Sequence, residues 1–163
     1  MRALRGSGKI STRCSRRAAF ADSSALVKLY ADEPGYQPIR ALDTLVISAL
    51  ARVEVPAALW RKTRTGELED AAANTLTSAF VFDFHGDSDS SPRFTVLSVT
   101  ESVLIAAARE AAHHALRAYD AVQLASAMAV REIDPRCGQF ACFDSELCRA
   151  ASRAGFRLIP EAD

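Results

Sequence analysis

The stretch AFADSSALVKLY, residues 19–30, places an aspartate between a short apolar run and a run with helical spacing. The residues before Asp22 predict a strand, and the residues after it predict a helix. At such a junction Asp22 has two interpretations. Its side chain accepts hydrogen bonds from the free N–H groups that open the helix, or it points into the crevice where α/β sheets bind ligands. This stretch alone leaves both open.

Four more short apolar runs follow, separated by stretches rich in alanine and leucine with helical spacing. The five expected strands are residues 18–21, 44–48, 94–99, 139–143 and 156–160. An alternation of strands and helices is typical of a mostly parallel sheet with helices on both faces. We therefore predict an α/β fold, a three-layer α/β/α domain with about five strands.

The length of 163 residues and a hydrophobic content of 49% suit one domain, expected over residues 18–163. No membrane span or secretory signal is expected, so the predicted location is the cytoplasm. Residues 1–17 carry six basic side chains and no acid, which leaves 14 basic and 20 acidic residues in the rest, a net charge of −6. We interpret residues 1–17 as a flexible tail or a start site assigned too far upstream; contact with nucleic acid or an acidic partner is the alternative.

Glu54 is the second acid of interest, because it falls on a helix expected to start after Ser48. On a helical wheel, Leu50, Val53, Ala57 and Trp60 form the stripe expected to face the core, and Glu54 falls on the same side. An ionised carboxylate there needs a cation, hydrogen bonds or a water-filled cleft. A salt bridge, for instance to Arg61, and a functional role both remain open.

Two further acids complete the set. Asp120 opens the most apolar helix pattern of the chain, where it has a plain interpretation as the N-cap with Gln123 completing a capping box. Asp144 repeats the arrangement of Asp22, since FACFDSEL at residues 140–147 mirrors AFADSSAL at residues 19–26. Two predicted strands therefore end in the same way.

These four acids are expected at the same edge of a parallel sheet, two at strand ends and two at the starts of helices. Four carboxylates in one cleft repel each other unless divalent cations neutralise them. An oxygen-rich site of this kind suits Mg²⁺ or Mn²⁺. Such a site activates water for attack on a phosphodiester.

The order of the motifs resembles a known family. DSSALVKLY, ISALARVEVPAAL, AYDAVQLASA and FDSEL followed by GFRLIP are similar to motifs of the PIN-domain ribonucleases, and within them of the VapC-type toxins of bacterial toxin–antitoxin pairs. The resemblance covers residues 18–160. It implies a three-layer fold, RNA cleavage that depends on Mg²⁺ or Mn²⁺, a homodimer, and a small antitoxin that occupies the active-site groove.

Carried over to this sequence, the resemblance assigns Asp22, Glu54, Asp120 and Asp144 as the catalytic, metal-binding acids. Asp22, Asp120 and Asp144 would hold the metal and position water, with Glu54 as a further ligand. Ser24 is expected to orient Asp22 from the second coordination shell.

Two residues depart from the family pattern. Cys142 stands where the family usually has a small hydroxyl residue, and a thiol is a poorer hydrogen-bond partner for a second-shell or substrate contact. Pro56 follows Glu54 by two residues and is expected to disturb the helix.

RNA binding by a body of negative charge requires local basic side chains, and Arg52 and Arg61 are the candidates. Lys62, Arg64, His113 and His114 are interpreted as helix-surface residues instead. The alternative function is a PIN-like domain that binds RNA or a protein without cutting. A receiver-type or phosphatase domain is a third interpretation, but it requires a second acid near Asp22, where Ser24 stands.

Overall fold

The computed structural model describes residues 18–161, so the predictions for residues 1–17 lie outside the described residues. One sheet contains the five strands β1 (Ala18–Ala21), β2 (Thr44–Ser48), β3 (Thr95–Leu97), β4 (Gln139–Ala141) and β5 (Arg157–Ile159). All neighbours pair in parallel, in the order β3-β2-β1-β4-β5. The five predicted strands are present, and the last three are shorter than predicted.

The strand order creates a switch point between β1 and β4. From β1 the chain adds β2 and then β3 on one side, and it later returns to place β4 and β5 on the other side. In open α/β sheets, ligands bind in the crevice outside the carboxyl ends of the strands at this point. Asp22 directly follows β1, and Asp144 is the third residue after β4. These two acids therefore flank the position at which the fold places a ligand site.

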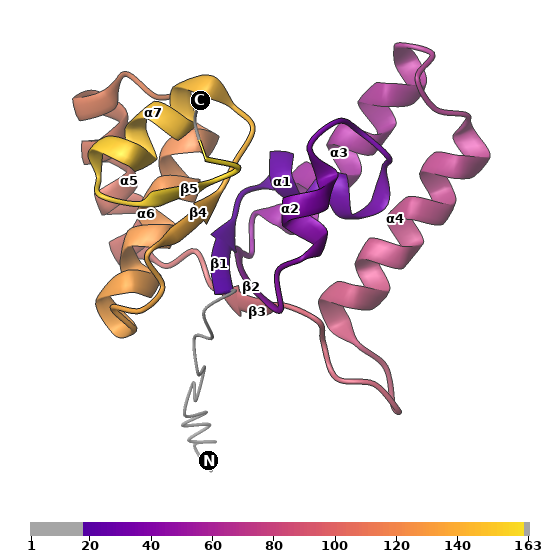
Figure 1. Cartoon of the computed structure of the whole chain (residues 1–163), viewed down its shortest axis with the longest axis horizontal. Helices are drawn as coiled ribbons and strands as arrows, with labels where there is room; N and C mark the ends of the chain where they lie inside the picture. Colours follow the sequence, from indigo (N-terminus) through magenta and orange to yellow (C-terminus); the bar gives the residue numbers. More distant parts are fainter. Residues whose placement is uncertain (1–17, 162–163) are drawn as a thin grey trace, which may run out of the picture.

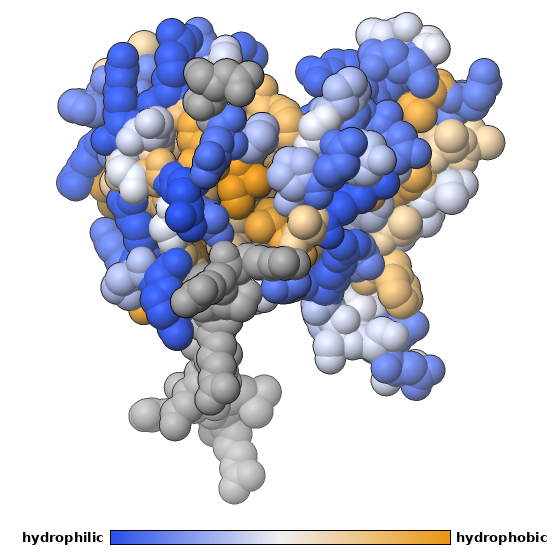
Figure 2. Space-filling view, in the orientation of Figure 1, coloured by the Kyte–Doolittle hydropathy of each residue, from blue (hydrophilic) through white to orange (hydrophobic). Residues whose placement is uncertain are grey.

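Seven helices cover the sheet within the described residues. They are α1 (Ser23–Tyr30), α2 (Tyr36–Arg40), α3 (Ala51–Arg64), α4 (Asp70–His85), α5 (Glu101–His114), α6 (Ala118–Ile133) and α7 (Ser145–Arg153). Figure 1 shows α5, α6 and α7 on one side of the central strands and α1 to α4 on the other. Figure 2 shows that the surface is hollowed between these two halves, with apolar residues exposed in the middle of the hollow.

Two apolar clusters fill the space between the three layers. Phe20 and Phe140 lie on one face of the sheet, where their rings stack with centroids 5.5 Å apart and contact the cluster of α5, α6 and α7. Ala19, Ala21 and Ile47 point to the opposite face and pack with the residues of α1 to α4. Because side chains alternate along a strand, each strand supplies both clusters. The fold is the predicted three-layer α/β/α arrangement.

The packing of α3 differs from the predicted stripe. Ala51, Val55 and Leu59 are its buried residues, whereas Val53 is 67% exposed. These three buried residues are spaced four apart, so they lie on one face of the helix. This face, and not the predicted stripe, packs on the core. The helix begins at Ala51 after the cap residue Leu50, since Ser48 is the last residue of β2.

Two further features complete the fold. α3 continues through Pro56 to Arg64 without interruption. Within residues 18–161, no helix is both long enough and apolar enough to cross a membrane.

Candidate active site

The first junction, between β1 and α1, buries its aspartate. Asp22 caps α1, and its Oδ1 accepts hydrogen bonds from the Ala25 N–H at 3.1 Å and the Ser24 hydroxyl at 2.8 Å. The residue is only 5% exposed. Burial raises the pKa of Asp22 to about 7, against the opposing effect of its hydrogen bonds. The carboxyl group is thus both a helix cap and a strongly perturbed acid.

Ser24 joins the ends of the two central strands. While its hydroxyl donates to Asp22, its Oγ accepts a hydrogen bond from the Phe143 N–H at 2.8 Å. Two residues before Ser24, the Asp22 N–H donates a hydrogen bond to the Ala141 carbonyl at 3.1 Å. Asp22 is therefore held from its own helix and from the end of β4.

The second junction, between β4 and α7, has the same local form. Asp144 caps α7, and its Oδ1 accepts hydrogen bonds from the Glu146 and Leu147 N–H groups at 2.9 and 3.0 Å. Its carboxylate is half-buried, in contrast to that of Asp22. The two aspartates thus share a capping role and differ in their exposure to solvent.

Glu54 lies in the first turn of α3 and is held by two other elements. Its Oε2 accepts hydrogen bonds from the Ser23 hydroxyl at 2.7 Å and from Gln123 Nε2 at 2.5 Å. Burial raises the pKa of Glu54, and the nearby charge of Asp120 raises it further. Glu54 points toward α1 and α6, although it lies at the edge of the buried face and not on the predicted stripe.

Asp120 is not the helix cap that one interpretation proposed. α6 begins two residues earlier, with Arg117 as its cap residue and no side-chain capping bond. Within the described part of the chain, no group donates a hydrogen bond to the Asp120 carboxylate. Burial raises the pKa of Asp120, with the charges of Asp144 and Glu146 adding to the effect and Arg117 opposing it. The capping-box interpretation is therefore wrong, which removes the plain explanation for an acid at this position.

Electrostatic coupling links the four acids in a row. Asp22 is influenced by Glu54, Glu54 by Asp120, and Asp120 by Asp144. Within residues 18–161, no lysine or arginine forms an ion pair with any of them, and no three His, Cys, Asp or Glu side chains lie close enough to hold one ion directly. Mg²⁺ usually binds through one or two carboxylates and keeps several waters. This row of oxygen donors, which lacks ion pairs within residues 18–161, therefore fits a hydrated divalent cation.

The sequence reasoning missed Ser23 and Arg117, and it assigned Gln123 only to a capping box with Asp120. Gln123 is 2% exposed, and its amide bonds both Glu54 and Ser23. A glutamine among the buried residues of α6 was the available signal, because a buried amide requires polar partners. Arg117 carried no comparable signal, since it directly precedes α6 and contributes its charge near Asp120 only in the folded chain.

Cys142 is buried beside the site and does not bond a carboxylate. Its thiol donates to the backbone carbonyl of Asp144 at 3.4 Å, and the Cys148 thiol donates to the Cys142 carbonyl at the same distance. The Cys148 thiol and burial together raise the pKa of Cys142, with a further contribution from Asp22. Cys142 is therefore a neutral thiol that contacts the loop before α7.

The predicted RNA-binding arginines are both exposed on α3. Arg52 lies in its first turn and Arg61 lies two turns beyond Glu54. Among the described residues, neither forms an ion pair, whereas Lys62 bridges Glu33 at 2.5 Å and Glu67 at 2.7 Å. The RNA-binding role of Arg52 and Arg61 stays a prediction.

The comparisons with known proteins agree with this architecture. Residues 19–152 match the family model of the PIN domain, and the match includes all four acids. PIN domains are typically metal-dependent nucleases that bind RNA. No curated protein matched the chain. Because the family match extends over most of the sequence and the parallel five-stranded sheet agrees with it, the chain belongs to the PIN domain family.

Proposed function

We propose that this protein is a ribonuclease that requires Mg²⁺ or Mn²⁺ and hydrolyses phosphodiester bonds within RNA. The observation that carries the proposal is the row of four acids at the switch point of the sheet. Three of them have raised pKa values, and none forms an ion pair with a lysine or arginine of residues 18–161. A structural ion-pair network would contain basic partners. Carboxylates whose pKa values are raised by burial, and which have no such basic partners, are typical of a functional site.

The proposed roles follow from the contacts of each residue. Asp22, Asp120 and Asp144 hold the metal, and Glu54 contributes through water. A bound Mg²⁺ or Mn²⁺ supplies activation of water and stabilisation of the negative charge that develops on the phosphate. Ser24 fixes Asp22, while Ser23 and Gln123 fix Glu54 by hydrogen bonds that leave its Oε1 available. Carboxylates oriented in this way need little rearrangement when the cation binds.

For the biological role, we propose the toxin of a toxin–antitoxin pair of the VapC type, active in the cytoplasm. The support is the order of the motifs around the four acids, which resembles these toxins along most of the chain. The same resemblance supports a homodimer and a small cognate antitoxin that occupies the active-site groove.

The test compares the wild-type protein with an Asp120→Asn variant, both purified without a partner. RNA cleavage is measured with Mg²⁺, with Mn²⁺ and with EDTA. We expect cleavage by the wild-type protein in either metal, and a loss of about 10²–10³-fold in the variant, as for removal of one group that stabilises the transition state. A Glu132→Gln variant on the exposed side of the same helix is the control. Equal cleavage by Asp120→Asn, or cleavage that survives EDTA, would contradict the proposal.

A PIN-like domain that binds RNA or a protein without cutting is the second candidate. The observation that favours it is Cys142, whose thiol contacts a backbone carbonyl where the family usually has a small hydroxyl residue. Tight RNA binding by the wild-type protein, with no cleavage in either metal, would support this candidate.

A further inference from the structure

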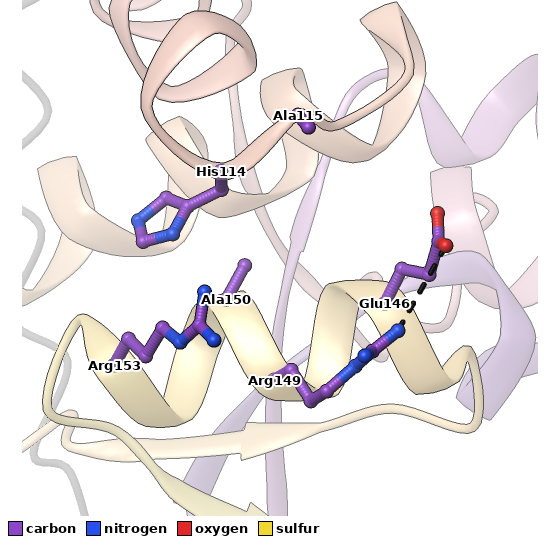
Figure 3. Close-up of a pocket in the computed structure, with 6 residues that line it drawn as sticks. All are labelled: His114, Ala115, Glu146, Arg149, Ala150 and Arg153. Atoms are coloured by element: carbon purple, nitrogen blue, oxygen red, sulfur yellow. Dashed lines mark ion pairs between the residues drawn. The ribbon is translucent and has the colours of Figure 1, made fainter.

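A hollow lies between the end of α5 and the helix α7. Its volume is about 220 Å³. A water molecule occupies about 30 Å³ of the liquid, so the hollow has room for a phosphate group and several waters. Its lining residues are His114, Ala115, Glu146, Arg149, Ala150 and Arg153. Figure 3 shows His114 projecting from α5 toward the side chains of α7.

His114 has an unsatisfied polar atom at this wall. Its side chain is 6% exposed, and its Nε2 lies 3.3 Å from Glu110 Oε2. Its Nδ1 is buried and has no hydrogen-bond partner. A buried polar atom without a partner costs about 1–3 kcal/mol. Figure 3 shows the His114 ring facing Arg153 across the hollow, so a polar group that enters beside Arg153 lies next to the ring.

Two arginines supply positive charge from α7. Arg149 and Arg153 are one helical turn apart and both are exposed. Arg149 lies 3.8 Å from Glu146 in a pair whose members are more than half exposed, and such pairs contribute little. Among the described residues, Arg153 forms no ion pair. The guanidinium group matches the geometry of a phosphate and binds it through two hydrogen bonds.

The hollow adjoins the row of acids. Glu146, which lines it, acts on Asp120 through its charge, and Asp144 caps the helix that carries both arginines. Arg117, two residues after Ala115 on the opposite wall, also acts on Asp120. A nucleic-acid strand whose scissile phosphate lies at Asp120 and Asp144 therefore has a positively charged hollow within reach of a neighbouring nucleotide.

We propose that this hollow binds a backbone phosphate of the RNA substrate next to the one that is cut. Arg149 and Arg153 contact the phosphate oxygens, and His114 Nδ1, when it carries a proton, donates to the same group. Binding of the phosphate releases Arg149 from Glu146. This inference rests on the proposed function, because it names a substrate contact of the same site. It differs from the arginines predicted on α3, which lie on the other half of the molecule.

The test measures binding of a fluorescein-labelled eight-nucleotide RNA to the cleavage-deficient Asp120→Asn protein, by anisotropy at several salt concentrations. Arg149→Ala combined with Arg153→Ala is expected to weaken binding about tenfold, and to reduce the log–log salt slope by about 0.7 for the phosphate lost. The loss is expected to be smaller for a dinucleotide, which cannot fill both positions. His114→Leu is expected to weaken RNA binding about threefold without lowering the thermal midpoint, because leucine leaves no buried polar atom without a partner. Arg109→Ala, on the helix that supplies His114, is the control for a surface arginine.

The outcomes separate this inference from the nuclease proposal. Cleavage by the wild-type protein, together with unchanged RNA affinity in the double arginine variant, would overturn the phosphate site alone. Weaker RNA binding in that variant would support the site even if the wild-type protein failed to cleave. A polyglutamate peptide that binds more tightly than the RNA, through the same arginines, would make the hollow a docking site for an acidic polypeptide and would overturn the inference.

Discussion

The two strand-to-helix junctions of this protein share a sequence pattern and differ in their physical environment. In each, an aspartate follows an apolar strand and accepts backbone hydrogen bonds at the start of a helix. Asp22 is 5% exposed with a pKa of about 7, whereas Asp144 is half-buried. The local motif therefore determines the cap, and the surrounding layers determine the electrostatics.

The difference arises from the residues around each cap. α1 packs against α2, α3 and α4, while α7 packs mainly against α6 and β5. Two positions after each aspartate, the first junction has Ser24 and the second has Glu146. Ser24 turns inward and bonds both Asp22 and the backbone of Phe143, whereas Glu146 is exposed and pairs loosely with Arg149. The first junction is thus a fixed interior site and the second is open to a ligand.

The largest expected difference between the junctions is in RNA cleavage. Asp22→Asn and Asp144→Asn both keep an N-cap residue of good propensity, so both proteins are expected to fold. We expect Asp22→Asn to lower kcat/KM by about 10³-fold. This is the upper end of the range for removal of one group that stabilises charge in the transition state. Asp144→Asn is expected to lower kcat/KM by about 10²-fold, at the lower end of the same range, because water screens its half-buried carboxylate.

Single-turnover cleavage of a labelled RNA in Mn²⁺ provides the measurement, and circular dichroism confirms the fold of each variant. If Asp144→Asn loses more activity than Asp22→Asn, burial of a carboxylate does not determine how much it contributes to cleavage.

The second difference is in the dependence of stability on pH. The folded-state pKa of Asp22, about 7, lies above its unfolded value of 3.8. Between these values the folded state binds more protons, so the free energy of unfolding falls as pH rises, by at most about 1.4 kcal/mol per pH unit. Urea unfolding in EDTA at pH 5 and pH 7.5 is expected to show lower stability at pH 7.5.

Variants at the two junctions show which carboxyl group causes this dependence of the free energy of unfolding on pH. Asp22→Asn is expected to reduce it, while Asp144→Asn retains it. Glu54 and Asp120, whose pKa values are also raised, account for the part that remains. Equal slopes in the wild-type protein and Asp22→Asn would assign the pH dependence to other groups.

The sequence predicted the strands well, because short strands depend on local patterns. The catalytic and metal-binding roles of the four acids stay predictions. Ala18–Ala21 and Thr44–Ser48 match the predicted boundaries, since short apolar runs between helices are unambiguous in a parallel sheet. The inward face of α3 was wrong because two helical stripes of similar hydropathy compete, and only the packing of α1 and α4 selects Val55 over Val53. The hydrogen bond from Gln123 to Glu54 joins residues 69 positions apart, which no local pattern encodes.

The serines at the two junctions predict a third, smaller difference, in stability. Ser24→Ala removes the partner of the Phe143 N–H and one donor to Asp22, so we expect a loss of about 1–3 kcal/mol in the free energy of unfolding. Ser145 is exposed, and its replacement by alanine is expected to change stability by less than about 0.5 kcal/mol. Urea unfolding at pH 5, where Asp22 is largely protonated in both proteins, gives the comparison. Similar losses for the two alanine variants would mean that Ser24 does not join β1 to β4 in solution.

The smallest expected effect concerns Cys142, where the sequence resemblance implies a small hydroxyl residue. Its thiol bonds the carbonyl of Asp144 and not the carboxylate, so the side chain acts on the position of the loop and not on the acid itself. Cys142→Ser places a better hydrogen-bond donor at the same point, a change of about 1 kcal/mol, which corresponds to about fivefold in rate. We therefore expect the cleavage rate to change by less than this factor. An effect as large as that of Asp144→Asn would show that residue 142 contacts the substrate directly, and that the second junction takes part in recognition as well as in metal binding.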